Sequence, residues 1–291
     1  MSEFPLISIG VSAYNRANYL PLCLNSLLDQ SYPNCEIIVV DDGSADNTAE
    51  LMRQQFPQIK YIYQENAGDA AAKNHAAEVA CGEYIVFNDS DDLFLPDTVA
   101  QLFAALPADG NGISYGTYRT IDADGKALPT KRKVAHYPSG MITGDLLMHI
   151  LVNSCGTLMP RKLFLEYGGF DRSLRVSHDY DLFLRMSLDN EFYAVQEPVF
   201  LRRRHGGNLS SGSYDKINLV LGVVERFLAA HPELEKRYER VIRTRRGDFH
   251  RKLYREARRE QRKEAVRIHA AKAFEYNPGI KSLWRMLTAG F

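Results

Sequence analysis

The sequence predicts an α/β protein with a mostly parallel sheet flanked by helices, followed by a helical C-terminal appendage. In the first hundred residues, short apolar runs alternate with helical patterns in a repeated strand–helix order. One of these runs, Ile37–Val40, contains only β-branched residues, which is typical of a strand covered on both faces. From about Tyr214 onward the pattern is helical throughout.

The first part of the chain is expected to contain four strands and four helices in alternation. The strands are expected at residues 6–11, 37–40, 59–63 and 84–87. The helices are expected at residues 20–28, 46–56, 70–80 and 96–106. Proline is accepted in a first helical turn, where Pro21 and Pro96 stand. Because each strand is followed by a helix, a parallel sheet with helices on both faces is favoured.

The later part of the chain follows a looser order. Strands are expected at residues 113–118, 193–196 and 199–203, and helices at residues 144–152, at residues 161–167 and from Asp179. Gly168-Gly169 ends the second of these helices. We expect one domain over residues 1–211 and a helical region over residues 212–291.

Charge is balanced overall but unevenly distributed. The chain has 36 lysines and arginines and 36 aspartates and glutamates. Residues 236–263 hold 13 basic and 4 acidic side chains, so the rest is net negative. Two interpretations stay open for this basic segment: a solvated helical face, or attraction to anionic lipid headgroups. It lacks a recognisable nucleic-acid-binding module, so no nucleic-acid partner is expected.

The remaining bulk features indicate a cytoplasmic protein, with peripheral contact at the inner face of the membrane if the basic segment binds lipid. The four cysteines show no paired spacing, so neither a disulfide framework nor a zinc site is expected. The N-terminal residues contain Glu3, whereas a signal peptide begins with basic residues, so no signal peptide is expected. No apolar run approaches the ~20 residues of a membrane span.

The acidic run Asn88–Asp92 directly follows the strand expected at residues 84–87. Three carboxylates within four residues repel one another, and Asp89 and Asp91 face the same side of an extended chain. Oxygen ligands so placed suit Mg²⁺ or Mn²⁺. The alternative is an aspartate-rich turn that caps the helix beginning near Pro96.

Polar groups also follow the first and second strands. Because ligands of parallel sheets bind beyond the carboxyl ends of the strands, these groups should converge on one crevice. Tyr14 can stack on a flat base, and Asp42 can accept a hydrogen bond from it. The alternatives are an aromatic at the edge of the core and a plain turn. The sequence has no glycine-rich phosphate-binding loop. A metal ion and cations such as Lys73 or His205 must therefore neutralise the charge of the phosphate groups.

Eight short segments together carry a resemblance to a known family. They are Val11 to Arg16, Val40 to Ser44, Asn66 to Gly68 with Lys73-Asn74, Gly82 to Tyr84, Asp89 to Asp92, Gly168 to Asp171, His178 to Leu182 and Arg204 to Ser210. In these segments the chain resembles the family 2 inverting glycosyltransferases, which have the GT-A fold, a Rossmann-like sheet flanked by helices. The resemblance covers roughly residues 5 to 211 and excludes the helical tail.

The resemblance implies a role for four residues in binding the nucleotide. Tyr14 would stack on the base, Asp42 would accept from its N–H group, and Ser12 would contribute through its backbone. Lys73 stands where such enzymes usually carry arginine, so it would contact the nucleotide as a point charge.

The resemblance also implies the metal ligands, with Mn²⁺ or Mg²⁺ as the cofactor. Asp91 matches the principal ligand of the D-x-D motif, and Asp89 matches the residue near the ribose and the metal. His205 would reach the metal or the diphosphate.

Asp179 matches the catalytic base of the family. An inverting transfer needs one base to take the acceptor's hydroxyl proton, so the chemistry agrees with this match. The alternative is a first-turn carboxylate that the helix dipole favours. Asp181 competes for the role but is expected to structure the helix start. The family usually has glutamate where this chain has His178, which affects acceptor placement or the basicity of Asp179.

The sequence therefore predicts an inverting, metal-dependent glycosyltransferase that uses a nucleotide-sugar donor, a UDP-sugar, and a glycan or lipid-linked acceptor. One rival is a sugar-1-phosphate nucleotidyltransferase. That class needs a glycine-rich, arginine-bearing loop after the first strand, and residues 12–16 do not provide one. A second rival is a non-catalytic nucleotide-sugar-binding subunit, for which His178 is the only support.

Overall fold

The computed structural model describes residues 4–129, 134–206 and 213–279, which fall into two compact units. The first unit is Met1–Ile142 with Leu151–Gly207, and the second is Thr143–Ile150 with Asn208–Phe291. Residues 143–150 cluster with the helical unit, although the sequence analysis assigned them to the first region. The expected boundary at residues 211 and 212, and the motif positions 207–210, lie outside the described residues.

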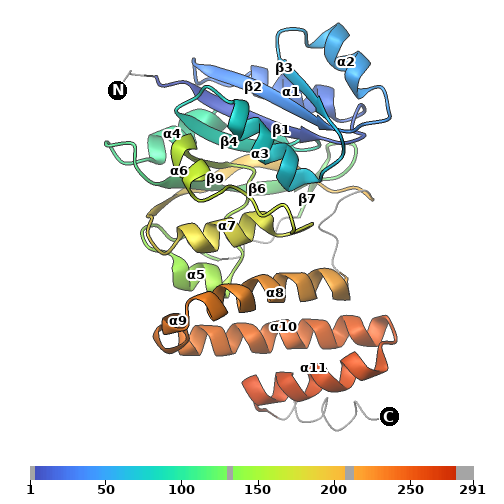
Figure 1. The fold of residues 1–291 in the computed structure, drawn as a ribbon, viewed down its shortest axis with the longest axis vertical. Helices are drawn as coiled ribbons and strands as arrows, with labels where there is room; N and C mark the ends of the chain where they lie inside the picture. Colours follow the sequence, from blue (N-terminus) through green and yellow to red (C-terminus); the bar gives the residue numbers. More distant parts are fainter. Residues whose placement is uncertain (1–3, 130–133, 207–212, 280–291) are drawn as a thin grey trace. The chain divides into compact units, whose positions relative to one another are not determined.

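Within the described residues, the first unit contains a nine-stranded sheet in the order β3-β2-β1-β4-β8-β6-β9-β5, with β7 paired to β6 (Figure 1). The strands are β1 (Ile7–Ala13), β2 (Cys35–Asp42), β3 (Lys60–Gln64), β4 (Tyr84–Asp89), β5 (Leu93–Phe94), β6 (Ile113–Ile121), β7 (Ala127–Leu128), β8 (Thr157–Pro160) and β9 (Phe192–Arg203). Strands β3, β2, β1 and β4 run parallel, which confirms the prediction for the first four strands. β8 is antiparallel to both of its neighbours, β4 and β6.

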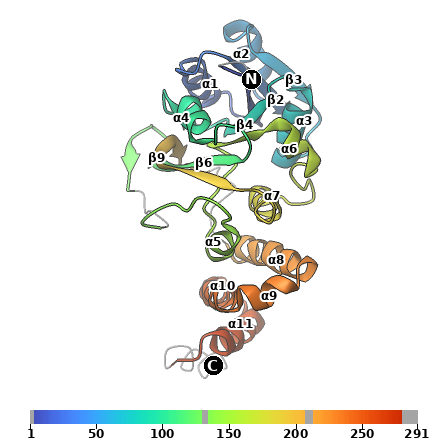
Figure 2. The ribbon, with the colours of Figure 1, turned by 90° about the vertical axis from the view of Figure 1, so that its left-hand side faces the viewer.

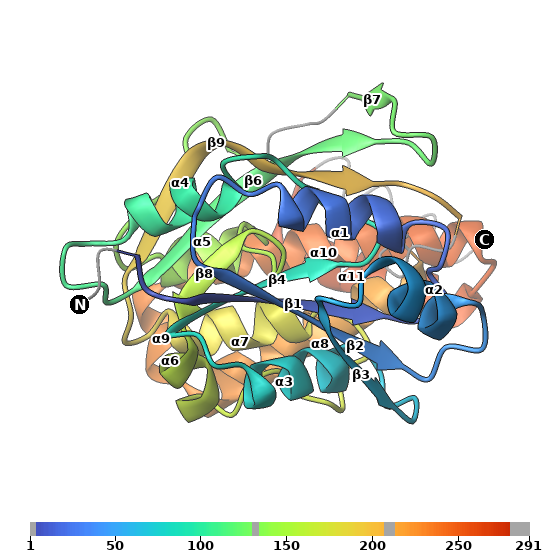
Figure 3. The same cartoon turned by 90° about the horizontal axis from the view of Figure 1, so that it is seen from above.

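The helices of the first unit cover both faces of this sheet (Figure 3). They are α1 (Leu20–Leu28), α2 (Thr48–Gln55), α3 (Asp69–Val79), α4 (Thr98–Ala105), α6 (Arg161–Glu166) and α7 (His178–Met186). Ile7, Ile9 and Val11 of β1 share a buried core with the apolar faces of α1 and α4. On the other face, a Cβ at Gly10 would lie 3.1 Å from that of Ala76 on α3. The alanine-rich helix therefore approaches the sheet closely, as its small side chains predicted.

The later strands differ from the expectation. Residues 193–196 and 199–203 belong to one strand, β9, and are not two separate strands. Its register with β6 shifts around Pro198, which has no N–H to donate to a ladder. β5, β7 and β8 have two to four residues each and were not expected, because so short a segment shows no periodicity.

This strand order determines where a ligand can bind. β1 lies between β2 and β4, so the strand order reverses at β1. Open α/β sheets bind ligands beyond the carboxyl ends of the strands at such a point. The carboxyl ends here are Ala13 of β1 and Asp89 of β4, and Ser12 pairs with Asp89 in register.

The second unit is helical, as expected. It contains α5 (Thr143–Met148), α8 (Tyr214–Ala230), α9 (Glu233–Arg237), α10 (Glu239–Arg259) and α11 (Lys263–Tyr276). Helices α8, α10 and α11 lie side by side (Figure 2) and bury apolar residues such as Val224, Phe227 and Leu253. In the described part of the chain, no helix is both long enough and apolar enough to cross a membrane.

A buried polar cluster lies among the helices of this unit. Nδ1 of His250 is 3.0 Å from Nδ1 of His269, and Nε2 of His269 is 2.8 Å from the hydroxyl of Tyr214. Burial, together with the positive charge of His269 when protonated, lowers the pKa of His250 to about 4. The pKa of His269 is also lowered, by burial and by Lys272. Both rings are therefore neutral in the folded protein near pH 7.

We expect the second unit to lose stability as the pH falls from about 6.5 towards about 4. In this range a histidine of the unfolded chain binds a proton, whereas the buried His250 stays neutral because its pKa is lower. Protonation therefore favours the unfolded state. Urea unfolding of the full chain at pH 7.5 and pH 5.0 measures the effect. His250→Phe keeps a ring without a titrating group, so it should lose less stability over this range. Equal pH dependence in both proteins would contradict the assignment.

Candidate active site

The loops that follow β1 and β2 are tied to each other. The backbone N–H of Asn15 donates to Oγ of Ser44 at 2.8 Å, and Oδ1 of Asn15 accepts from the N–H of Ala45 at 2.8 Å. Asn15 has a positive φ of 52°, which asparagine tolerates better than most residues. Tyr14, which precedes it, is 49% exposed. The ring is thus presented to solvent at the carboxyl end of β1, where it is accessible for stacking.

Asp42 lies at the carboxyl end of β2 and is almost completely buried. Its carboxylate accepts hydrogen bonds from the backbone N–H groups of Ala67 and Gly68, both at 2.8 Å, and from Nε2 of Gln64 at 2.7 Å. These bonds fix the turn that leads into α3. Any bond from a base must use a carboxylate lone pair that these three bonds leave over.

Lys73 is the central cation of the strand ends and is only 2% exposed. Its Nζ contacts Oδ2 of Asp69 at 2.9 Å, Oδ1 of Asp89 at 2.7 Å and Oγ of Ser154 at 3.2 Å. An ammonium has three N–H donors, and these acceptors match all three. A nucleotide phosphate would have to replace one of them to contact Lys73.

Burial and neighbouring charges shift the pKa values of this cluster in opposite directions, and the effect of the charges is larger. Burial would lower the pKa of Lys73, but Asp69 and Asp89 together raise it well above its usual value. Burial would raise the pKa of Asp69, but Lys73 and the hydrogen bond from His178 hold it well below its usual range. Ser12 also donates to the Asp69 carboxylate. Lys73 and Asp69 are therefore both charged near pH 7.

Asp91 and His205, which are 114 positions apart in the chain, lie against each other. Oδ2 of Asp91 is 2.7 Å from Nε2 of His205, and the imidazole stacks on Tyr19 with ring centroids 4.9 Å apart. Nε of Arg16 is 4.0 Å from the same carboxylate oxygen. A carboxylate oxygen and an imidazole nitrogen so close together could both ligate one divalent cation.

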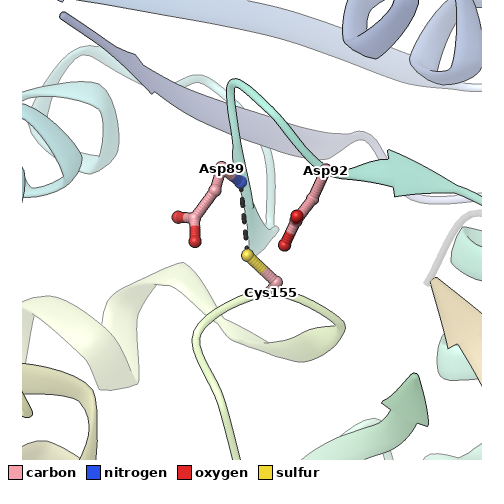
Figure 4. Close-up of side chains that lie close together, drawn as sticks. All are labelled: Asp89, Asp92 and Cys155. Carbon is pink, nitrogen blue, oxygen red and sulfur yellow. Dashed lines mark hydrogen bonds between the residues drawn. The ribbon is translucent and has the colours of Figure 1, made fainter. Parts of the chain in front are cut away.

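A second group consists of Asp89 and Asp92, which stand on either side of Asp91 in the sequence, and Cys155. One potential ligand atom from each residue lies within 4.8 Å of the others. Figure 4 shows the backbone N–H of Asp89 directed at Sγ of Cys155, 3.2 Å away. Burial, followed by the charge of Asp89, raises the pKa of both Cys155 and Asp92. Oδ1 of Asp92 already accepts from the backbone N–H of Arg203 at 2.8 Å, which attaches β9 to the acidic run.

Asp179 and Asp181 occupy the first turn of α7 but have different surroundings. Asp179 is partly exposed, and within the described residues its carboxylate accepts only from the N–H of Tyr180, at 2.8 Å. Asp181 is buried and contacts Nε of Arg185 at 3.0 Å, and Arg185 also donates to the carbonyls of Tyr167 and Gly169. Asp181 therefore structures the start of the helix, as expected. Asp179 retains free acceptor capacity.

The predicted residues form local groups. Ser12, Lys73 and Asp89 belong to one connected network, and Asp91 and His205 form a pair. Within the described residues, the carboxylate of Asp42 bonds to residues 64–68 and that of Asp179 bonds within α7, so neither hydrogen-bonds to Lys73 or Asp91.

Sequence reasoning missed Asp69, Ser154 and Arg203, although Asp69 stands four positions before Lys73 on one helix, a spacing typical of ion pairs. Arg203 is buried, and its Nε donates to the carbonyl of Asp91 at 3.0 Å. No local sequence signal distinguishes it from the neighbouring arginines.

Comparison with known proteins identifies close relatives in sequence. The family described as Glycosyl transferase family 2 matches residues 8–168. An uncharacterized glycosyltransferase of Rickettsia typhi is 33% identical over 217 residues, which are 73% of this chain and 68% of that protein. Chondroitin synthase of Escherichia coli is 28% identical over 219 residues, which are 74% of this chain but only 31% of the synthase.

Solved structures show the same fold. S. aureus TarS 1–349 in complex with UDP-GlcNAc gives a TM-score of 0.61 at 17% identity, covering 93% of this chain and 88% of that one. The mannosyltransferase PcManGT from Pyrobaculum calidifontis, in complex with GDP-Man and Mn²⁺, gives 0.61 at 18% identity, covering 99% and 80%. These likenesses show that the chain has the GT-A fold.

We expect Lys73→Met to destabilise the protein by about 2 kcal/mol or more, because it removes a buried cation from between two partly buried carboxylates. Lys162→Met is the matched control, since it removes an exposed lysine paired with Glu166 on α6 and should change stability little. Chemical denaturation of both variants measures the difference. Equal, small losses would show that Lys73 does not stabilise the strand ends.

Proposed function

The chain belongs to glycosyl transferase family 2 and is a glycosyltransferase, and from this premise we propose a specific reaction. The donor is a nucleotide-sugar, a UDP-sugar, and the acceptor is a hydroxyl group of a glycan or a lipid-linked sugar. The transfer inverts the anomeric configuration and depends on a divalent cation. The main observation in favour is that two polar contacts form at the strand ends, Lys73 of α3 with Asp89 of β4, and His205, after β9, with Asp91, after β4.

The nucleotide-binding part of the proposal depends on the loops after β1 and β2. The exposed ring of Tyr14 offers a stacking surface, and Ser12 and Asp42 lie at the ends of the same two strands. Lys73 counters the charge of Asp89 directly, so its effect on the donor is electrostatic and acts through Asp89. The nucleotide-sugar complexes of the two structural neighbours support a donor of this class.

The donor set at Asp91 and His205, with Asp89 nearby in sequence, fits a divalent cation. A carboxylate suits either Mg²⁺ or Mn²⁺, whereas an imidazole nitrogen favours Mn²⁺ over Mg²⁺. When bound, such an ion supplies positive charge against the charge that develops on the leaving diphosphate. The Mn²⁺ bound to PcManGT agrees with this choice.

Asp179 is proposed as the general base. Its carboxylate takes the proton of the acceptor hydroxyl while the acceptor oxygen bonds to the anomeric carbon. The bond from that carbon to the diphosphate oxygen breaks at the same time, and the nucleoside diphosphate leaves on the opposite face. The carboxylate is partly exposed and, in the described part of the chain, accepts a hydrogen bond from the N–H of Tyr180 alone, so it is accessible for this role.

We expect Asp179→Asn to retain binding of UDP with Mn²⁺ and to lower turnover by about 10²-fold or more, because no base remains at that position. Release of nucleoside diphosphate from UDP-glucose, UDP-GlcNAc, UDP-glucuronate and GDP-mannose measures turnover and identifies the donor. Asp145→Asn makes the same change in the first turn of α5 and serves as the control. Wild-type turnover in Asp179→Asn would remove that residue from the base role, and pyrophosphate release from UTP would favour a nucleotidyltransferase.

We also propose that the basic face of α10 binds anionic membrane lipids. This face consists of the exposed side chains Arg240, Lys252, Arg255, Arg258 and Arg259. Partial desolvation of Lys252 along the helix, together with the like charges of Arg245 and Arg255, lowers its pKa, which indicates a locally positive field. Such a field attracts anionic headgroups and would bring the enzyme to a lipid-linked acceptor.

The triple change of Arg255, Arg258 and Arg259 to Gln should abolish co-sedimentation with phosphatidylglycerol vesicles, because about 1 kcal/mol is lost for each basic residue removed. The control changes Arg53, Lys162 and Arg172 to Gln, which removes the same charge from exposed positions in the first unit. Salt should release the wild type. Equal loss in both triple variants, or no wild-type binding, would contradict the proposal.

A further inference from the structure

One carboxylate connects three separate segments of the first unit. The side chain of Asp69, the first residue of α3, accepts from Oγ of Ser12 at the end of β1. Its Oδ2 atom is 2.9 Å from Nζ of Lys73 and 3.2 Å from Nε2 of His178, the first residue of α7. A strand end and two helix starts therefore meet at one side chain.

His178 is held firmly in this arrangement. It is 7% exposed, and its ring meets Phe170 edge to face with centroids 4.9 Å apart. Because Nε2 faces a carboxylate, it carries a proton and donates to Asp69. Asp69 thereby fixes both the tautomer and the orientation of the ring. Nδ1 is buried and has no hydrogen-bond partner among the described residues, so Asp69 provides the only polar anchor of the ring.

A continuous chain of charged contacts results from this geometry. Asp89 contacts Lys73 at 2.7 Å, Lys73 contacts Asp69 at 2.9 Å, and Asp69 contacts His178 at 3.2 Å. His178 directly precedes Asp179 in the sequence. The acidic strand end on the donor side and the helix that carries the proposed base are thus linked through Lys73, Asp69 and His178. Two of these three linking side chains, Lys73 and His178, are buried.

The identity of residue 178 matters because Asp69 is its neighbour. A carboxylate at position 178 would lie against the Asp69 carboxylate and repel it. Histidine supplies an N–H donor at this position. Asp69 and His178 therefore act as a matched pair, in which the carboxylate gives the buried ring its hydrogen-bond acceptor.

We propose that Asp69 and His178 are positioning residues that set the distance between the donor site and Asp179. This inference rests on the proposed transferase function. Lys73 holds Asp69 in place on the donor side, and His178 transmits that position to the start of α7. Because a shift of about 1 Å at a reacting group costs up to about 10²-fold in rate, loss of the bridge should lower kcat. The KM for the donor should change less when His178 is replaced, since its polar contact is with Asp69 and not with a proposed nucleotide-binding residue.

The test compares four variants by kcat and donor KM, with the four nucleotide-sugars named above and Mn²⁺. His178→Gln keeps an N–H donor facing Asp69 and should retain most of the wild-type kcat. His178→Glu places a second carboxylate there and should lower kcat about tenfold or more, with donor KM within about twofold. Asp69→Asn with His178→Glu again pairs one carboxylate with one N–H donor and should recover most of the loss. Asp69→Asn alone should lower kcat without unfolding the protein.

Glu78→Gln is the matched control, because it removes an exposed ion pair between α3 and Arg172 while the Asp69 bridge stays intact. Wild-type kcat in His178→Glu or in Asp69→Asn would overturn the bridge, as would a double variant no better than His178→Glu. A wild type that releases nucleoside diphosphate from none of the four donors would instead refute the transferase function on which the bridge depends.

Discussion

The buried ammonium of Lys73 is the interaction on which the strand ends depend. It lies between the carboxylates of Asp69 and Asp89 and is almost inaccessible to water. Without it, the carboxylate of Asp89 at the end of β4 would repel the carboxylate of Asp69 that begins α3, and both would lose the cation that lies between them. Its three acceptors come from α3, from β4 and from Ser154, so a single side chain joins three parts of the unit. Arg203 complements it by joining β9 to the acidic run.

Around this cation, the sheet brings together groups that are distant in the sequence. Because β1 lies between β2 and β4, the loops after these strands share one edge. β9 then brings His205 to Asp91 across 114 positions. The architecture belongs to a GT-A glycosyltransferase of family 2. Lysine at position 73 and histidine at position 178 stand together in one network with Asp69.

Sequence reasoning succeeded where the relevant information is local. The strands β1 to β4 are short apolar runs between helical patterns, so their succession along the chain and their parallel arrangement could be predicted. The insertion of β8 between β4 and β6 could not, since it depends on pairing between segments more than seventy positions apart. Asp91 and His205 were recognised as separate candidates, but their contact required the course of β9. Lys73 was expected to face the nucleotide, whereas its burial between two aspartates is visible only in three dimensions. Residues 143–150 belong to the helical unit through long-range packing, so this too could not be predicted from the local sequence.

A cation and a nucleotide diphosphate are proposed to bind beyond the carboxyl ends of β1 and β4. Crystals of the full chain soaked with UDP and MnCl₂ test this site, because the anomalous signal of manganese locates the ion independently of the protein. We expect a manganese peak at coordination distance from Asp91, about 2.2 Å away, with the diphosphate beside it and the uracil ring on Tyr14. A peak elsewhere on the protein, or bound UDP remote from Asp91, would contradict it.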